Sequence, residues 1–166
     1  KFLALFSQKT DVLFVCTENI CRSPLAEGLL RHHLRRAGLG RDVRVRSAGP
    51  RVSAPGSRPD QRARSLAKAS GINIDSCRAT RVTEKALIAS DLVVAMDRAN
   101  LRDLLKLCPP EHQHKIILLL SFLKGEDQGE VPDPYYGSVE GFREVSELID
   151  RAIIAMLPHL GNSVGR

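Results

Sequence analysis

Short runs of apolar residues alternate along the chain with longer segments in which apolar residues recur every three or four positions. The first pattern is typical of strands buried on both faces of a sheet, and the second of amphipathic helices. The predicted strands cover residues 12–15, 43–47, 91–96 and 115–120, and the predicted helices cover residues 24–34, 59–70, 100–107 and 140–157. This alternation predicts a single-domain α/β fold with a four-stranded parallel sheet flanked by helices on both faces. Ligands of such folds bind at the carboxyl ends of the strands.

The loop between the first strand and the first helix reads Cys16-Thr17-Glu18-Asn19-Ile20-Cys21-Arg22-Ser23. A thiol, a guanidinium six residues later and a hydroxyl therefore share one short segment. Pro24, directly after it, suits the first turn of a helix. The free N–H groups and the positive dipole end of that helix favour an anion, so the loop is predicted to bind phosphate.

Three side chains of this loop suit phosphoryl transfer. A helix N-terminus and a neighbouring cation favour the thiolate form of Cys16, which makes its sulfur a nucleophile. Arg22 presents a planar fork of donors that holds two phosphate oxygens and stabilises the charge of the transition state. Ser23 is placed to donate a hydrogen bond to the thiolate when it leaves. The alternative to a nucleophile is that Cys16 is a small residue buried in the core. This alternative has to be weighed because the pattern Cys-x5-Arg often arises by chance.

A second motif, Val131-Pro132-Asp133-Pro134-Tyr135-Tyr136-Gly137, lies far along the chain. The flanking prolines restrict the backbone around Asp133 and so aim its carboxyl group. Cleavage of a phosphate ester needs an acid that protonates the departing oxygen. Asp133 is the candidate for this acid, and afterwards for the base that activates water; the alternative is an aspartate that caps a turn. Tyr135 and Tyr136 are candidates for the wall of a substrate cleft.

Length and composition agree with one enzyme domain. The 166 residues, 43% of them hydrophobic, can bury one core, and no segment is long enough to span a bilayer. We expect a catalytic domain over residues 11–158, a terminal extension over residues 1–10 that lacks signal-peptide features, and a tail over residues 159–166. The formal charge of +6 suits anionic substrates, but the arginines are scattered, which argues against nucleic acid as a partner. Four cysteines form no secreted disulfide framework, so we expect a cytoplasmic protein.

From Asp11 to about Leu157 the chain resembles the low-molecular-weight protein tyrosine phosphatase family. The motifs that carry the resemblance are residues 16–27, Ser47-Ala48-Gly49, Pro59-Asp60, Met96-Asp97 with Asn100-Leu101, and Asp133-Pro134-Tyr135-Tyr136-Gly137. The resemblance implies a flavodoxin-like fold of the phosphotyrosine phosphatase I type. It also implies a metal-independent phosphomonoester hydrolase, with phosphotyrosine in proteins and small aryl phosphates as substrates. No cofactor and a monomer or weak dimer are expected.

The same resemblance assigns roles to residues of the two motifs. Cys16 would attack phosphorus and form a cysteinyl-phosphate, Arg22 would clamp the phosphoryl oxygens, and Asp133 would act first as acid and then as base. The residues that the resemblance assigns to the network holding the loop are Asn19, Ser23 and Ser47. Cys21, five residues after Cys16, is a candidate redox partner that traps the oxidised nucleophile as a reversible disulfide.

Several positions depart from the family pattern. Glu18 stands where the family commonly has a glycine, and it adds a negative charge near an anionic substrate. Cys77 stands where a histidine of the supporting network is common, with Thr80 at a common arginine position. Ser53 lies near a position where many relatives carry an aromatic wall of the cleft. Stacking on a substrate ring would then rest on the two tyrosines of the second motif.

These departures leave alternatives open. Thr17 follows the nucleophile as in phosphoarginine-directed relatives, whereas Tyr135 stands where those relatives tend to carry phenylalanine, so phosphoarginine is the second candidate substrate. A thioredoxin-coupled arsenate reductase would need Cys77 and Cys108 as a redox relay, but they are far apart in sequence. A catalytically impaired module that only binds phosphorylated partners is the third alternative.

Overall fold

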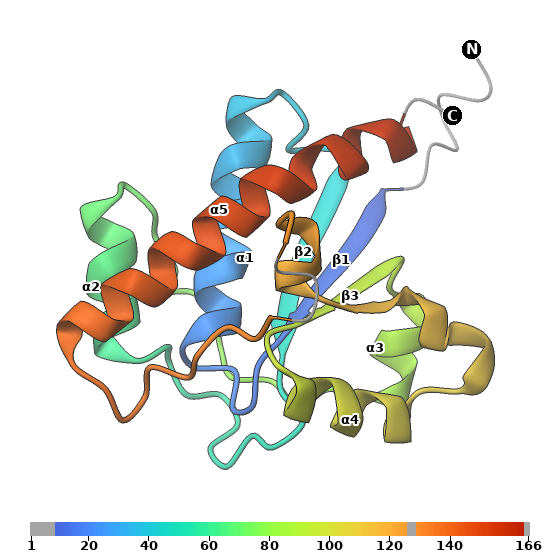
Figure 1. Ribbon diagram of the computed structural model, residues 1–166, viewed down its shortest axis with the longest axis horizontal. Coiled ribbons are helices and arrows are strands. Elements are labelled where there is room, and N and C mark those ends of the chain that lie inside the picture. Colours follow the sequence, from blue (N-terminus) through green and yellow to red (C-terminus); the bar gives the residue numbers. More distant parts are fainter. Residues whose placement is uncertain (1–8, 126–128, 165–166) are drawn as a thin grey trace.

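The computed structural model describes residues 9–125 and 129–164, which form one parallel sheet with helices on both faces (Figure 1). The strands are β1 (Thr10–Val15), β2 (Val43–Ala48), β3 (Leu92–Ala95) and β4 (Ile116–Leu118), in the spatial order β2-β1-β3-β4. The helices are α1 (Arg22–Arg36), α2 (Gln61–Ala69), α3 (Glu84–Ala89), α4 (Arg98–Leu107) and α5 (Val139–Val164), with 3-10 helices η2 (Pro110–Lys115) and η3 (Leu119–Phe122). The predicted α/β fold with its four-stranded parallel sheet is confirmed.

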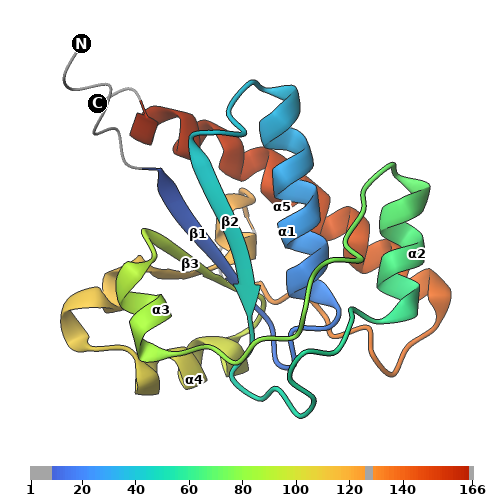
Figure 2. The ribbon, with the colours of Figure 1, turned by 180° about the vertical axis from the view of Figure 1, so that it is seen from behind.

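Successive residues of the central strand point into two different hydrophobic layers. Val12 and Phe14 of β1 pack with residues of α1 and α5, whereas Leu13 and Val15 pack with residues of α3 and α4. Accordingly, α1, α2 and α5 lie on one side of the sheet, and α3 and α4 lie on the other (Figures 1 and 2). Because both faces are covered, β1 reads as a continuous apolar run instead of an alternating one.

The strand order changes direction at β1, which has β2 on one side and β3 on the other. At such a switch point the loops at the carboxyl ends of the strands diverge and leave a crevice. The Cys16 loop leaves β1 there. The second motif reaches the same edge of the sheet, because the N–H of Val131 donates to the carbonyl of Met96, directly after β3, at 2.9 Å.

Several elements differ from the sequence prediction. The strand predicted over residues 115–120 is limited to β4, because η3 turns the chain and the Ser121 hydroxyl donates to the Leu118 carbonyl at 2.6 Å. The last helix continues through Pro158 to Val164. The short helix α3 was not predicted; Thr83 caps it by accepting the N–H of Ala86 at 3.1 Å.

Residues 1–8 of the expected terminal extension and residues 165–166 of the expected tail lie outside the described residues, and β1 begins at Thr10. In the ranges that the structure describes, no helix combines the length and the apolar character that crossing a membrane requires.

Candidate active site

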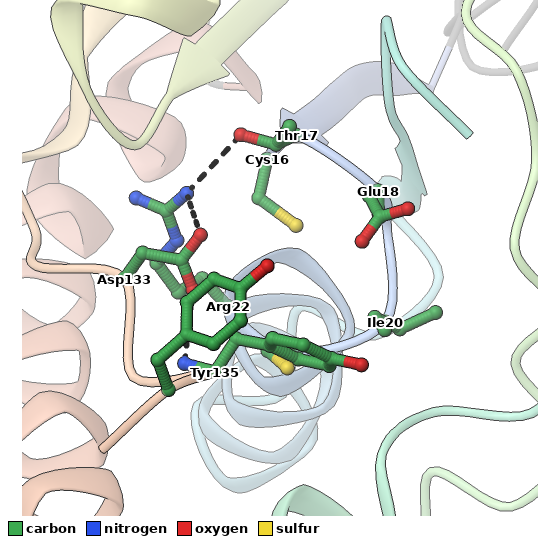
Figure 3. Close-up of a pocket in the computed structure, with 9 residues that line it drawn as sticks. Cys16, Thr17, Glu18, Ile20, Arg22, Asp133 and Tyr135 are labelled. Atoms are coloured by element: carbon green, nitrogen blue, oxygen red, sulfur yellow. Dashed lines mark hydrogen bonds and ion pairs between the residues drawn. The ribbon is translucent and has the colours of Figure 1, made fainter. Parts of the chain in front are cut away.

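The Cys16 loop and the Asp133 loop enclose a cavity of ≈ 170 Å³ (Figure 3). The residues that line it are Cys16, Thr17, Glu18, Ile20, Cys21, Arg22, Asp133, Tyr135 and Tyr136. Arg22 and Asp133 are 111 positions apart in the chain, yet Arg22 Nη2 lies 3.5 Å from Asp133 Oδ2. The two motifs that the sequence presents separately therefore form one site.

One side of the cavity is the N-terminal end of α1. Cys21 is the cap residue, and its side chain makes no capping hydrogen bond to the helix. Within the described chain, the backbone N–H groups of residues 18–21 donate to no protein acceptor. The end of this 15-residue helix thus keeps its donors and the positive end of its dipole available for an anion.

The two terminal nitrogens of the Arg22 guanidinium have different partners. The residue is 1% exposed, and its Nη1 donates to Asp97 Oδ2 and to the carbonyl of Val131, each at 2.8 Å. Its Nη2 makes only long contacts of 3.5 Å, to Thr17 Oγ1 and Asp133 Oδ2 (Figure 3). Nη1 therefore fixes the side chain, and Nη2 is the nitrogen available to the oxygens of an anion.

Cys16 Sγ lies 2.9 Å from Ser23 Oγ, at the start of a chain of hydrogen bonds. The side-chain amide of Asn19 donates to Ser23 Oγ at 2.7 Å and to Ser47 Oγ at 2.9 Å. The Ser47 hydroxyl in turn donates to Glu27 Oε1 at 2.9 Å. The sulfur is thereby linked through three polar side chains to a carboxylate that is only 6% exposed.

Two backbone features hold the loop in this shape. Asn19 has a φ of 59° and is the one non-glycine residue of the described ranges in the left-handed region, which asparagine tolerates better than most residues. Its Oδ1 accepts the N–H of Thr80 at 2.9 Å. Gly49 follows β2, and a Cβ there would lie 2.7 Å from the carbonyl oxygens of both Cys16 and Thr17. Only glycine lets β2 end this close to the loop.

The Asp133 loop is more exposed than the Cys16 loop. The Asp133 side chain is 47% exposed, and its Oδ1 accepts the N–H of Tyr135 at 3.1 Å. The rings of Tyr135 and Tyr136 meet edge to face, with centroids 4.8 Å apart. Arg62 holds the loop by donating to the Tyr135 carbonyl at 2.8 Å, while its guanidinium lies 4.3 Å from the ring centroid of Phe142.

The family model for low molecular weight phosphotyrosine protein phosphatases matches residues 11–165 of the chain. The chain belongs to this family. A putative low molecular weight protein-tyrosine-phosphatase of Synechocystis is 35% identical over 154 residues, which cover 92% of this chain and 98% of that protein. Low molecular weight protein-tyrosine phosphatase A of Mycobacterium tuberculosis is 40% identical over 147 residues, which cover 89% of each chain.

Solved structures of phosphatases share the fold. The protein tyrosine phosphatase of Entamoeba histolytica has a TM-score of 0.88 and 32% identity, over 93% of this chain and 99% of that one. The arginine phosphatase YwlE has a TM-score of 0.83 and 27% identity, over 92% of this chain and 96% of that one. The overall fold alone therefore does not separate enzymes that differ in the phosphorylated side chain they act on.

Two departures from the family pattern meet at the rim of the cavity. Glu18, at the common glycine position, keeps a backbone φ outside the left-handed region. Its Oε1 accepts the hydroxyl of Ser53 at 2.5 Å, and its side chain lines the cavity. Ser53, predicted for the substrate cleft, does not line the cavity itself. It contributes by holding the Glu18 carboxylate.

Cys77, which the resemblance places at a common histidine position, joins the supporting network through its thiol. Cys77 Sγ donates to Glu27 Oε2 at 3.0 Å, and Arg31 forms an ion pair with the same oxygen at 2.7 Å. Burial and the neighbouring Glu27 carboxylate raise the pKa of the Cys77 thiol to about 12, so the thiol keeps its proton and remains a donor. The network includes Cys77 and is connected through Glu27.

The other cysteines lie in different surroundings. Cys21 is buried beside Cys16 in the cavity lining, and burial, followed by the charges of Asp60 and Cys16, raises the pKa of its thiol. Cys77 and Cys108 pack against hydrophobic clusters on opposite faces of the sheet, and neither lines the cavity. This placement does not provide the close cysteine pair that an arsenate reductase relay needs.

Three residues of the site were not assigned a role from the sequence. Asp97 holds Arg22, Glu27 ends the network, and Arg62 holds the Asp133 loop. Glu27 had a detectable signal, because it lies three and seven positions before Leu30 and Leu34 on the buried stripe of α1. A carboxylate on an apolar stripe needs buried partners. Arg62 contacts backbone carbonyls, which leave no trace in the sequence.

Proposed function

We propose that this chain is a protein tyrosine phosphatase that hydrolyses phosphomonoesters through a cysteinyl-phosphate on Cys16. The observation that carries the proposal is the meeting of Cys16, Arg22 and Asp133 around one cavity at the N-terminal end of α1. A nucleophile, an anion clamp and a proton donor are the three groups that ester cleavage at phosphorus requires. The names of the relatives support the same activity.

In the first step, the thiolate of Cys16 attacks phosphorus and the bond from phosphorus to the ester oxygen breaks. Asp133 gives its proton to that departing oxygen, which leaves as an alcohol or phenol. Arg22 Nη2 and the free N–H groups of residues 18–21 bind the other phosphoryl oxygens, where negative charge is spread in the transition state.

In the second step, water attacks the cysteinyl-phosphate. The Asp133 carboxylate takes a proton from this water, and inorganic phosphate leaves as the thiolate of Cys16 is restored. The Ser23 hydroxyl, 2.9 Å from Cys16 Sγ, stabilises the departing thiolate. Asn19 and Ser47 keep Ser23 in place through the network.

Phosphotyrosine in proteins is the proposed substrate. Tyr135 and Tyr136 line the cavity and offer ring edges and faces to an aryl group. Phosphoarginine is the second candidate: Thr17 follows the nucleophile, and the Glu18 carboxylate at the rim can pair with a guanidinium. YwlE, named an arginine phosphatase, also shares the fold.

The direct test compares phosphotyrosine and phosphoarginine peptides of the same sequence in the presence of a chelator. We expect hydrolysis of the phosphotyrosine peptide to be at least about tenfold more efficient by kcat/KM, blocked by vanadate and abolished in Cys16→Ser. The reverse preference would assign the arginine activity instead. Full activity in Cys16→Ser would overturn the mechanism for both substrates.

The cellular setting is part of the proposal. All four cysteines are free thiols, which supports a reducing compartment such as the cytoplasm.

Cys21 is the proposed redox partner of Cys16. Both residues line the same cavity, so the Cys21 thiol can attack a sulfenic acid on Cys16. This step releases water and forms a disulfide, which a cellular dithiol reduces again. We propose a monomer or weak dimer that acts on phosphorylated proteins.

A further inference from the structure

A second, larger cavity of ≈ 480 Å³ lies beside the end of β2. Its lining comes from β1, α1, β2, α3 and the segment of residues 76–83. This segment passes the carboxyl end of β2, where Gly49 and Arg81 form a bridge (Figure 2). No lining residue is shared with the catalytic cavity. The volume falls within the range of pockets that bind small molecules, roughly 300–1,000 Å³.

The charge of this second cavity is one-sided. The arginines that line it are Arg31, Arg46, Arg78 and Arg81, and the one acidic residue in the lining is Glu27. Glu27 is already engaged by Arg31 at 2.7 Å, by Ser47 and by Cys77. Three guanidinium groups in one cavity therefore have no carboxylate to neutralise them within the described residues.

The hydrogen bonds of these three arginines leave most of their donors unused. Arg78 Nη1 donates to the carbonyls of Asp75 and Cys77, and Arg81 Nη2 donates to the carbonyl of Val52. In the described part of the chain, the buried Nε of Arg46 has no hydrogen-bond partner. A buried donor without a partner is unfavourable and like charges gathered in one cavity repel, so the cavity suits a ligand that is both anionic and a hydrogen-bond acceptor.

The chemistry of the lining selects phosphate groups among anions. Arginine forks bind phosphate with two parallel hydrogen bonds, and the hydroxyl-bearing residues Ser76, Thr80 and Thr83 also line the cavity. Three unneutralised arginines in this volume exceed what a single phosphate needs. We propose that the cavity binds a small oligophosphate anion, a chain of two or three phosphates with or without a nucleoside.

This site is separate from the proposed catalytic reaction but adjoins its supporting network. Glu27 and Ser47 line the second cavity and also belong to the hydrogen-bond chain that reaches Cys16. An anion there would contact Arg31, the ion-pair partner of Glu27. Binding of an anion in the second cavity does not require hydrolysis, so this proposal can be tested independently of the proposed function.

The test is calorimetric titration of inorganic tripolyphosphate into the full chain without divalent metal, with the Cys16 loop saturated by benzylphosphonate. We expect one saturable site that persists under this block. Arg46→Gln and Arg78→Gln should each weaken binding at least about tenfold, because each removes a charge-assisted hydrogen bond. Arg78 is exposed, so its substitution leaves the core intact, and thermal unfolding followed by circular dichroism checks both variants.

Arg44→Gln is the matched control, because Arg44 lies on the same strand two positions from Arg46 but does not line the cavity. We expect it to change the affinity by less than about twofold. Equal losses in all three variants, or no saturable binding once the loop is blocked, would overturn the proposal. Orthophosphate binding as tightly as tripolyphosphate would overturn the oligophosphate assignment. If ATP binds more tightly than tripolyphosphate, the ligand is a nucleotide. If the two bind equally, the cavity recognises the phosphate chain alone.

Discussion

The two sides of the catalytic cavity are built in opposite ways. On the Cys16 side, Asn19, Arg22 and Ser23 are at most 2% exposed. Asn19 and Arg22 are fixed by hydrogen bonds to distant segments, and Ser23 is fixed by Asn19 within the loop. On the other side, the side chains of Asp133 and Tyr135 are roughly half exposed, and Tyr136 is 94% exposed. In the proposed mechanism, the buried side carries the bond-making chemistry, and the exposed side carries proton transfer and recognition of the leaving group.

The exposed side is held by its backbone. Arg62 donates to the carbonyls of Tyr135 and Gly137, at 2.8 and 3.2 Å, and lies over the ring of Phe142. Both hydrogen bonds are made to the backbone of the loop and do not involve the side chains of Asp133 and the two tyrosines. Substitutions on the two sides should therefore have different signatures.

The largest effect is expected for Arg22→Lys on the buried side. A lysine has a single nitrogen and cannot serve Asp97, the Val131 carbonyl and an anion together. We expect kcat for an aryl phosphate to fall about 10²–10³-fold, as for the loss of a positioned transition-state donor. Arg62→Lys, on the exposed side, is the matched control and should cost less than about tenfold. If steady-state kinetics give equal losses of kcat in the two variants, the distinction between the two sides is contradicted.

Next in size is Asp133→Asn. Without a proton donor, esters with poor leaving groups should lose about 10²–10³-fold in kcat, whereas a nitrophenyl ester, whose oxygen leaves unaided, should lose much less. The check is a plot of the logarithm of kcat against the pKa of the leaving phenol for both proteins. The slope should steepen in the variant; an unchanged slope with a uniform loss contradicts the acid role.

Stability separates the two sides as well. Asn19→Ala removes three hydrogen bonds, to Ser23, Ser47 and Thr80, and places alanine in the left-handed region. We expect a loss of about 2–4 kcal/mol in the free energy of unfolding. Tyr136→Ala should stay within about 0.5 kcal/mol, because its ring is exposed. Denaturant titration measures both, and a small loss for Asn19→Ala would mean that the network does not stabilise the loop.

The smallest effect is expected at the rim. Glu18→Gln removes a negative charge from the cavity lining, so kcat/KM for a dianionic aryl phosphate should rise about twofold to fivefold at low salt. The gain should shrink as salt is added. Ser53→Ala, which keeps the charge but frees the carboxylate, is the control and should show no such salt-dependent gain. A loss of activity in Glu18→Gln would show that this carboxylate supports the reaction.

Much of the fold could be predicted from the sequence, because the spacing of apolar residues and the presence of turn residues are local signals. The apolar runs identified all four strands, and the helix predicted over residues 100–107 ends at the same residue as α4. The short helix α3 escaped because six residues are too few for a periodic pattern, although Thr83 is a typical cap. Strand β4 was predicted too long, because an apolar run looks the same whether it continues as a strand or enters a buried 3-10 helix.

The candidate site was predictable where one motif supplies several groups. Cys16, Arg22 and Asp133 were selected from motif chemistry and meet around one cavity. Asp97 and Arg62 could not be assigned, because what they contact depends on how distant segments pack. The hydrogen bond from Cys77 to Glu27 also joins residues 50 positions apart, so the sequence alone did not reveal whether Cys77 connects to the network.

The central claim is that Cys16 carries the phosphoryl group during turnover. The measurement that tests it most directly mixes Asp133→Asn, which lacks the base for the second step, with a nitrophenyl phosphate and quenches in acid within the first turnover. Peptide mapping by mass spectrometry should place one phosphoryl group on the peptide that contains Cys16. A nucleophile that cleaves the bond between sulfur and phosphorus should remove this group. A phosphoryl group on another residue, or continued turnover with Cys16 unmodified, would contradict the account.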